Sequence, residues 1–525
     1  MKKWLFTLLA LPFMFTSCID DESNEELRTL NPIQIENIRI PDSFSIFMGD
    51  TLKIQPLIYC EGVPDAKLSF EWRLSGGTIA PRVIDSTMYC EAKLVIPPFA
   101  NPYTLRLTVT DETTGISRIE TFNVRVLSSF GEGLIVADTK DDKESDLTLV
   151  MSKQFSSEIS GNDDKMKIVR NLWSESNGQK LDGKVLDLIT SSYGTNRSMT
   201  VVTDKHLYRA DYYDYFNIPE EFDGGMFIVV PPHVGHGYKN AFFQYYNSTG
   251  EEFLSLDGLV TRRSMQQNNR KHSYTQYPRG VTDYNVTFMC SPKYNDVYAF
   301  DALGERIIFF NFQNASLPQN QSSTGEFDIR DLKDFEALYM GEINQGVALL
   351  TKQKSTGQYK ALVMQRRGLW DPQPPTYAKA VFDFSDATEI ESAKFFELNK
   401  REDVVYYATD TKLYATPLSV IDAKVQWEAD TSTGEKITGL KLYKWSGGTC
   451  DYEEVGAEED EDSKKSVSSS DRLMMITTYS ELTKEGRVYC VPIVTYGLGG
   501  LEQNKNYHVV LNGFNKILGV YKQNN

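Results

Sequence analysis

Cys18 is the residue whose surroundings most clearly predict chemistry, namely acylation of its thiol. Lys2 and Lys3 precede an apolar run over residues 4–15, and small residues lie directly before the cysteine. A charged start, a short apolar run and a small-residue cleavage site are typical of a secretory signal peptide, here residues 1–17. The run is too short for a membrane span, which needs about 20 residues. The alternative is an ordinary signal peptide with a chance cysteine.

An acidic tract follows this cysteine directly. Residues 18–30 are polar, contain Asp20, Asp21, Glu22, Glu25 and Glu26, and lack periodicity, so we expect a tether. An acidic tract beside an acylated cysteine resembles the surface-export signal of Bacteroidota-type lipoproteins. The resemblance implies a protein of the outer membrane that faces the cell exterior. Its membrane contact would be the lipid anchor alone. Two or more acyl chains on one residue hold a protein stably at a membrane, whereas a single chain does not.

Aromatic residues beside turn residues form a second set with functional chemistry. Exposed rings stack on sugar faces or anchor extended peptides, because they bury a large area at a low entropic cost. We therefore predict ligand binding by glycan- or peptide-type contacts at Tyr212, Tyr213, Tyr215, Tyr245, Tyr246 and Trp370. The alternative is that these rings pack between sheets.

Other catalytic and metal-binding patterns do not stand out in the sequence. His233 and His236 lie in a loop and would need a third ligand, so we predict no metal site and no cofactor. No nucleophile motif or phosphate-binding loop occurs, and we predict no catalytic residue. The 72 acidic residues still leave a glycosidase-type pair of carboxylates as an alternative.

Charge and cysteine content narrow the partners further. The formal charge is −17, which disfavours nucleic acid as a partner. The cysteines after position 18 are odd in number and lack a CxxC pair, which argues against a disulfide framework. Cys60 and Cys90 fall in one small domain and could pair; buried thiols are the other interpretation.

Residues 31–128 alternate apolar and polar side chains in short runs. Residues 103–109 place every second side chain on one face, and residues 122–126 return after a turn around Gly115. With Trp72 available for the centre, this length predicts a β-sandwich. The central Trp followed by Tyr-x-Leu-x-Leu-x-Val-x-Asp resembles PKD (polycystic kidney disease) and other Ig-like domains.

A turn followed by an aromatic residue recurs through residues 131–525. Residues 203–208 are matched by residues 409–414, and looser copies bring the set to seven. In the turns at residues 203–208 and 409–414 we expect the Asp to bond its own backbone. The aromatic positions are 45, 45, 61, 55 and 75 residues apart, which allows one four-stranded blade and a loop each, at Tyr208, Phe253, Tyr298, Tyr359, Tyr414 and Tyr489.

These intervals predict a β-propeller of about seven blades, in an all-β chain. The last apolar runs, residues 509–511 and 517–521, could close the ring against the first blade. Residues 331–340 are the one stretch in which we expect a helical turn. The widest interval holds an acidic, Ser-rich insertion at residues 451–470.

Together, these features resemble the PKD-like family of surface lipoproteins. The shared motifs are architectural, so Cys18 is the one functional residue that carries over. The resemblance implies an accessory or substrate-capture subunit beside a SusC/SusD-like TonB-dependent importer, without catalysis, that handles a glycan or peptide. A surface hydrolase with its site at the propeller mouth and a structural adhesion protein are the alternatives.

Overall fold

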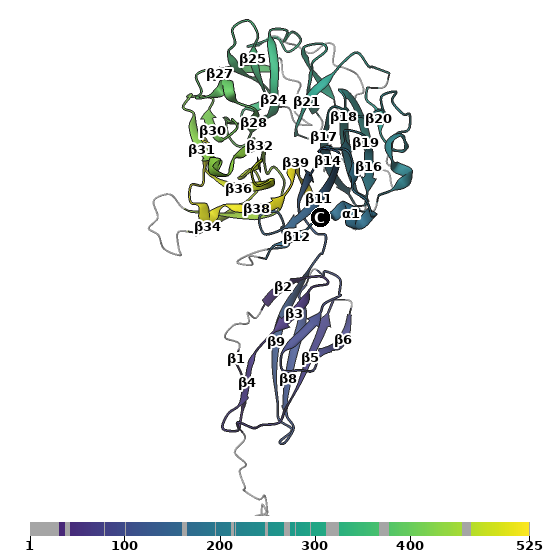
Figure 1. Cartoon of the computed structure of the whole chain (residues 1–525), viewed down its shortest axis with the longest axis vertical. Helices are drawn as coiled ribbons and strands as arrows, with labels where there is room; N and C mark the ends of the chain where they lie inside the picture. The colour runs from purple at the N-terminus through teal and green to yellow at the C-terminus, as the bar shows by residue number, and fades with distance from the viewer. Residues whose placement is uncertain are drawn as a thin grey trace, which may run out of the picture. The chain divides into compact units, whose positions relative to one another are not determined.

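The computed structural model shows a chain built mainly from β-strands (Figure 1). It forms two units, Met1–Val126 and Leu127–Asn525. The structure describes residues 31–36, 43–77, 79–99, 101–159, 165–194, 196–211, 215, 217–246, 250–266, 273–278, 280–293, 296–310, 325–366, 377–453 and 464–523.

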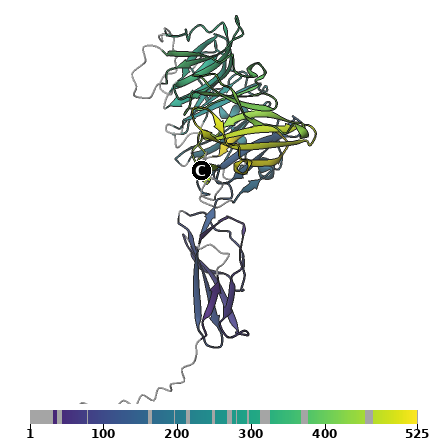
Figure 2. The same ribbon diagram turned by 90° about the vertical axis from the view of Figure 1, so that its left-hand side faces the viewer.

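The first unit is a β-sandwich, as predicted. Both views show its strands running lengthwise beside one another (Figures 1 and 2). One face is a five-stranded sheet in the order β2 (Ser43–Phe47), β9 (Ser117–Leu127), β8 (Tyr103–Asp111), β5 (Leu68–Gly76) and β6 (Ile79–Asp85). The other strands form two pairs, β1 (Ile33–Glu36) with β4 (Leu57–Cys60), and β3 (Thr51–Ile54) with β7 (Cys90–Lys93).

Trp72 lies at the centre of this sandwich. Its side chain is fully buried, its ring stacks on Phe122 with centroids 6.1 Å apart, and its indole N–H donates to the Thr87 carbonyl at 2.9 Å. Strand β8 alternates buried and more exposed residues, as the sequence pattern predicted. Cys60 and Cys90 are both buried free thiols.

Seven antiparallel sheets make up the described part of the second unit, together with one two-stranded ribbon. In chain order of their first strands the sheets are β39-β10-β11-β12 with β13, β14-β15-β16, β17-β18-β19-β20, β21-β22-β23, β24-β25-β26-β27, β28-β29-β30-β31 and β32-β35-β36-β37 with β38. The ribbon is β33 (Thr449–Glu453) with β34 (Lys464–Ser468).

The strands of these sheets have the following bounds. They are β10 (Gly133–Thr139), β11 (Glu144–Met151), β12 (Lys167–Val169), β13 (Leu181–Asp182), β14 (Val185–Tyr193), β15 (Asn196–Thr203), β16 (Leu207–Ala210), β17 (Ala241–Tyr246), β18 (Glu251–Leu256), β19 (Leu259–Ser264), β20 (Thr275–Gln276), β21 (Val286–Lys293), β22 (Asp296–Asp301), β23 (Arg306–Phe310), β24 (Phe335–Ile343), β25 (Gly346–Gln353), β26 (Tyr359–Met364), β27 (Ala378–Asp383), β28 (Phe395–Leu398), β29 (Val404–Ala408), β30 (Lys412–Pro417), β31 (Lys424–Glu428), β32 (Glu435–Leu442), β35 (Leu473–Ser480), β36 (Glu485–Thr495), β37 (Gly500–Leu501), β38 (Val509–Phe514) and β39 (Lys516–Gln523).

One strand of each sheet lies on the inside of a closed ring. The contacts run from β14 to β17, β21, β24, β28 and β32, and β39 touches both β32 and β14. Figure 1 shows these strands around the middle of the unit. Radial sheets around a common axis define a β-propeller, which confirms the predicted fold class.

The C-terminal strand closes the ring. Strand β39 pairs antiparallel with β10 from Gly133–Gln523 to Thr139–Lys516, so the first sheet contains both ends of the unit. This is the arrangement expected for residues 517–521. Residues 509–511 differ from the expectation, because β38 pairs with β36 in the last sheet.

The recurring turns join neighbouring strands, but the residue that holds them is not the one expected. In the turn after β15, the Thr203 hydroxyl accepts the backbone N–H groups of Lys205 and His206 at 3.2 and 2.9 Å. The neighbouring Asp204 instead accepts the Lys184 N–H at 2.8 Å. Thr409 repeats this geometry in the matching turn. The threonine therefore closes the turn, because its hydroxyl reaches two amides at once.

Helical structure is sparse, and one expected position was wrong. Residues 335–343 form strand β24, and residues 332–335 before it form a single hydrogen-bonded turn that does not continue into a helix. The one α-helix among the described residues, α1 (Leu172–Asn177), begins after Asn171 without a local side-chain cap. Asp146 of β11 accepts the amides of Trp173 and Ser174 instead. A cap from a distant strand leaves no local sequence signal.

Short 3₁₀ turns complete the second unit. They are η2 (Pro219–Glu221), η3 (Asp223–Met226), η4 (Ile390–Ser392), η5 (Thr431–Thr433) and η7 (Lys505–Tyr507). In the part of the chain that the structure describes, no helix has the length and apolar character that crossing a membrane requires.

Candidate functional site

Most of the residues predicted to bind a ligand lie outside the residues that the structure describes. Cys18, Tyr212, Tyr213 and Trp370 lie outside the described residues. Tyr245 and Tyr246 are the last two residues of β17, opposite Glu252 and Glu251 of β18, and their side chains are also outside the description.

Tyr215 is described, and it lacks the exposed ring that stacking requires. Its side chain is fully buried, packs edge-on against Phe130 at 5.6 Å, and donates its hydroxyl hydrogen to Gln523 of the closing strand. Its backbone, with a φ of 61°, is held by two hydrogen bonds: the Tyr215 N–H donates to the Asp211 carbonyl, and the Tyr215 carbonyl accepts from the Asn177 side-chain amide. Tyr215 therefore packs the ring closure, which is the alternative that the sequence left open.

A different group of polar and aromatic side chains gathers at the inner strands. We call it the axial cluster and divide it into an open half and a closed half. The open half is Asp187 of β14, Lys441 of β32, Trp445 and Tyr521 of β39; the closed half is Tyr339 of β24, Glu397 of β28 and Lys444.

Lys441 is the centre of the open half. Its ammonium lies 4.8 Å from the centre of the Tyr521 ring and 5.4 Å from that of Trp445, so two aromatic faces hold the cation. Burial lowers the pKa of Lys441, while Asp187 and Glu397 oppose that shift.

Asp187 supplies the opposite charge. Its two oxygens accept the Leu188 N–H at 2.9 Å and the Phe243 N–H at 2.8 Å. Burial raises the pKa of Asp187 to about 6, although Lys441 and these two amides limit the rise. The residue nevertheless keeps partial exposure.

In the closed half, the side chains of Tyr339 and Lys444 both donate to Glu397. Glu397 Oε1 accepts the Tyr339 hydroxyl and Lys444 Nζ, both at 2.7 Å, and Oε2 accepts the Leu442 N–H at 3.0 Å. Burial alone would lower the pKa of Lys444, but Glu397 more than offsets this and raises it. This ion pair links β28 to the end of β32 and so fixes the backbone that carries Lys441 and Trp445.

The open half therefore offers complementary chemistry to a ligand. Lys441 can donate to an oxygen, Asp187 can accept from a hydroxyl or amide, and Trp445 presents aromatic surface, while Tyr521 is buried behind Lys441. Because Lys441, Asp187 and Trp445 all retain partial exposure, a ligand could reach them. Such a mixture suits a polar, uncharged or zwitterionic group of a glycan or peptide.

The sequence contains a weak signal for this cluster. Asp187 stands between Leu186 and Leu188, and Lys441 stands between Leu440 and Leu442, each within a strand. A single charge inside an apolar strand is costly unless it is paired or functional. Their proximity could not be predicted, because it depends on the closure of the whole ring.

The described part of the chain contains no cluster of side chains that could bind a metal ion. None of its His, Cys, Asp and Glu side chains form a group of three or more that could hold an ion. His233 is half enclosed by protein, and burial lowers its pKa.

Comparisons with known proteins bear mainly on the first unit. The sequence model of the PKD-like family matches residues 18–184, which include all of the sandwich and the beginning of the propeller. The chain thus joins a PKD-like segment to a β-propeller. No curated protein matches.

Several solved structures resemble this chain, with low sequence identity and low TM-scores. A quinoprotein alcohol dehydrogenase-like protein from Bacteroides thetaiotaomicron is 11% identical over 93% of this chain and 99% of its own, with a TM-score of 0.30. The WD40 domain of SCAP from fission yeast is 8% identical over 63% and 74%, with a TM-score of 0.34. Dipeptidyl peptidase 4 from Porphyromonas gingivalis is 11% identical over 72% and 60%, with a TM-score of 0.30. Similarity at this level supports no conclusion about activity.

Proposed function

We propose that this chain is a lipid-anchored protein of the outer cell surface that captures a glycan or peptide without cutting it. In this proposal Cys18 carries the anchor, the PKD-like sandwich is a spacer, and the propeller binds the ligand. Its partner would be a SusC/SusD-like TonB-dependent importer, which receives the captured material. The signal at residues 1–26 and the PKD-like match support the surface location.

The main support for a binding role is the arrangement of side chains in the open half of the axial cluster. A lysine that is held between aromatic rings and is still reached by solvent can exchange water for a hydrogen-bond acceptor on a ligand. Lys441 is in that position, between two rings and near a carboxylate whose pKa is raised. A ligand that accepts from Lys441 and donates to Asp187 would satisfy both groups.

The engagement of Glu397 favours binding over hydrolysis. A glycosidase needs two carboxyl groups free to act as acid and base or nucleophile. Within the axial cluster Glu397 is committed to Tyr339, Lys444 and two backbone amides. Asp187 is then the one carboxylate of the cluster that a ligand could engage.

A binding screen with matched variants tests this proposal. The processed chain is screened against glycan and peptide arrays, and the best ligand is titrated into wild type, Lys441→Gln and Lys436→Gln. Lys436 lies on the same strand but is exposed, so it controls for the loss of charge. We expect Lys441→Gln to weaken binding at least about tenfold and Lys436→Gln to leave it unchanged. Equal affinities, or turnover of the ligand by wild type, would contradict the proposal.

A second experiment tests the location and the partner. The tagged protein is isolated from its native cells in mild detergent, beside a Cys18→Ser variant. Acylation of wild type alone, together with recovery of a TonB-dependent barrel, is the expected result. An unacylated wild-type protein, or elution without any transporter, would overturn that part of the proposal.

A further inference from the structure

A cavity lies away from the axial cluster, where the first and last sheets of the propeller meet. Its volume is about 230 Å³, smaller than the roughly 300–1,000 Å³ of typical drug-sized sites. It is lined by Lys153, Gln154, Cys450, Asp451, Lys464, Leu473, Cys490, Asn506, Tyr507 and Val509. These residues come from the turn after β11, the ribbon β33–β34, strands β35, β36 and β38, and the turn η7.

The ribbon forms one wall of this cavity because two glycines let it approach the first sheet. Gly447 and Gly448 have φ values of 87° and 83°. A Cβ on Gly448 would lie 2.1 Å from the Gln154 carbonyl oxygen, so this position requires glycine. The Thr449 N–H then donates to the Lys153 carbonyl at 2.6 Å. The cavity is thus a built feature of the ring closure.

The charges inside the cavity largely satisfy one another. Asp451 Oδ2 accepts Lys153 Nζ at 2.8 Å and Lys464 Nζ at 3.0 Å, and Oδ1 accepts the Ser466 hydroxyl. Burial alone would raise the pKa of Asp451, but these bonds hold it below its ordinary value. Lys464 remains 43% exposed at its side chain and has N–H groups left to donate.

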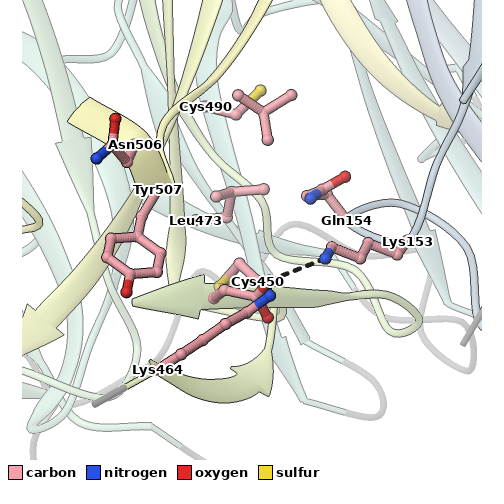
Figure 3. A pocket seen from close by; sticks show the side chains of 10 residues that line it. Lys153, Gln154, Cys450, Lys464, Leu473, Cys490, Asn506 and Tyr507 are labelled. Carbon is pink, nitrogen blue, oxygen red and sulfur yellow. Dashed lines mark hydrogen bonds and ion pairs between the residues drawn. The ribbon is translucent and has the colours of Figure 1, made fainter. Parts of the chain in front are cut away.

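Aromatic and amide groups complete the lining. Figure 3 shows Tyr507 and Asn506 on one side of the cavity, Lys153 and Gln154 on the other, and Leu473 between them. A ring-sized ligand can therefore lie against Tyr507 while its edges meet amide and ammonium groups. Planar polar side chains together with one aromatic face suit the hydroxyl groups and the C–H face of a sugar.

We infer that this cavity binds one neutral sugar ring. Its volume limits the ligand to a single ring, its balanced charges favour an uncharged one, and its donors suit hydroxyl oxygens. A site this small predicts a weak affinity, with Kd on the order of 1 mM. This second site does not depend on the axial cluster.

Saturation-transfer NMR with the full processed chain tests the inference. The probes are glucose, galactose, mannose and N-acetylglucosamine, with galacturonate and free amino acids for comparison. We expect a neutral sugar to bind, and Tyr507→Ala to weaken it at least about tenfold. Tyr507→Phe, which keeps the ring, should bind as wild type does, and it guards against a general loss of folding.

A lysine pair provides the matched control for the polar contacts. Lys464 and Lys465 are neighbours on β34, so their side chains leave opposite faces of the ribbon. Lys464→Met should weaken sugar binding, whereas Lys465→Met should leave it unchanged. Lys441→Gln at the axial cluster should leave this binding intact, which separates the two sites. Preference for galacturonate or an amino acid, binding by none of the sugars, or full binding by Tyr507→Ala would overturn the inference.

Discussion

Replacing Asp187 with asparagine should make the propeller more stable at neutral pH. Asp187 has an ordinary pKa of 3.8 and a folded-state pKa of about 6. At 1.36 kcal/mol per pKa unit this difference corresponds to about 3 kcal/mol. Because the side chain retains partial exposure, and because the asparagine NH2 group cannot accept one of the two backbone N–H groups that Asp187 accepts, we expect a smaller gain, of about 1 kcal/mol, in the free energy of unfolding of Asp187→Asn at pH 7.5.

The sign of the effect depends on pH. Between about pH 4 and 6 the folded state binds more protons at Asp187 than the unfolded state does, so this group makes wild type more stable as the pH falls. At pH 7.5 both states are ionised, and the folded state bears the full cost of the buried charge. Near pH 4 the carboxyl group is protonated, and Asp187→Asn should lose its advantage.

Urea unfolding at pH 7.5, 6 and 4, followed by circular dichroism, measures this difference. Glu336→Gln is the control, because Glu336 is an exposed carboxylate on the inner strand β24. It should change the free energy of unfolding by less than about 0.5 kcal/mol. An Asp187→Asn variant that is less stable at pH 7.5, or a difference that does not depend on pH, would refute the reasoning. A destabilising charge at this position is what a binding role explains.

Three further predictions concern other parts of the molecule. Lys522 of the closing strand is buried and donates to Glu132, so Lys522→Met should destabilise the propeller at pH 7 by about 3–5 kcal/mol in urea unfolding. Adding Glu132→Gln should recover part of the loss, and an unchanged stability of Lys522→Met would contradict a stabilising role for this ion pair. Trp72→Ala should cost the sandwich about 3–5 kcal/mol while leaving ligand affinity unchanged, and a weaker affinity would argue against a spacer role. Burial raises the pKa of Cys90 and of Cys450 to about 12, so thiol reagents at pH 8 should modify them slowly until urea is added; rapid modification of the native protein would contradict their burial.

The fold was largely predictable because its signals are local. The alternation at residues 103–109 and the single Trp72 sufficed for the sandwich. The turn motifs marked hairpins correctly, but their spacing was uneven for a structural reason. Five of the seven join the second and third strands of a sheet counted from the axis, while those at residues 249–253 and 294–298 join the first and second. Turns at opposite ends of the blades cannot keep one period.

The candidate site was less predictable because it depends on distant contacts. Tyr215 looked like part of an exposed cluster, but its partner Gln523 is 308 positions away. Asp187 and Lys441 lie near each other through closure of the ring, and no local pattern reports that closure. Composition could identify a propeller rich in aromatic residues, but it could not separate rings that pack from rings that bind.

Hydroxyl-radical footprinting of Trp445, with and without the captured ligand, tests the central claim most directly. Trp445 is partly exposed beside Lys441, while Trp427 lies on the outer strand β31 against Tyr489 and serves as an internal control. Binding at the axial cluster predicts that the ligand protects Trp445 and leaves Trp427 unchanged. Saturating ligand that protects neither residue, or only Trp427, would contradict it.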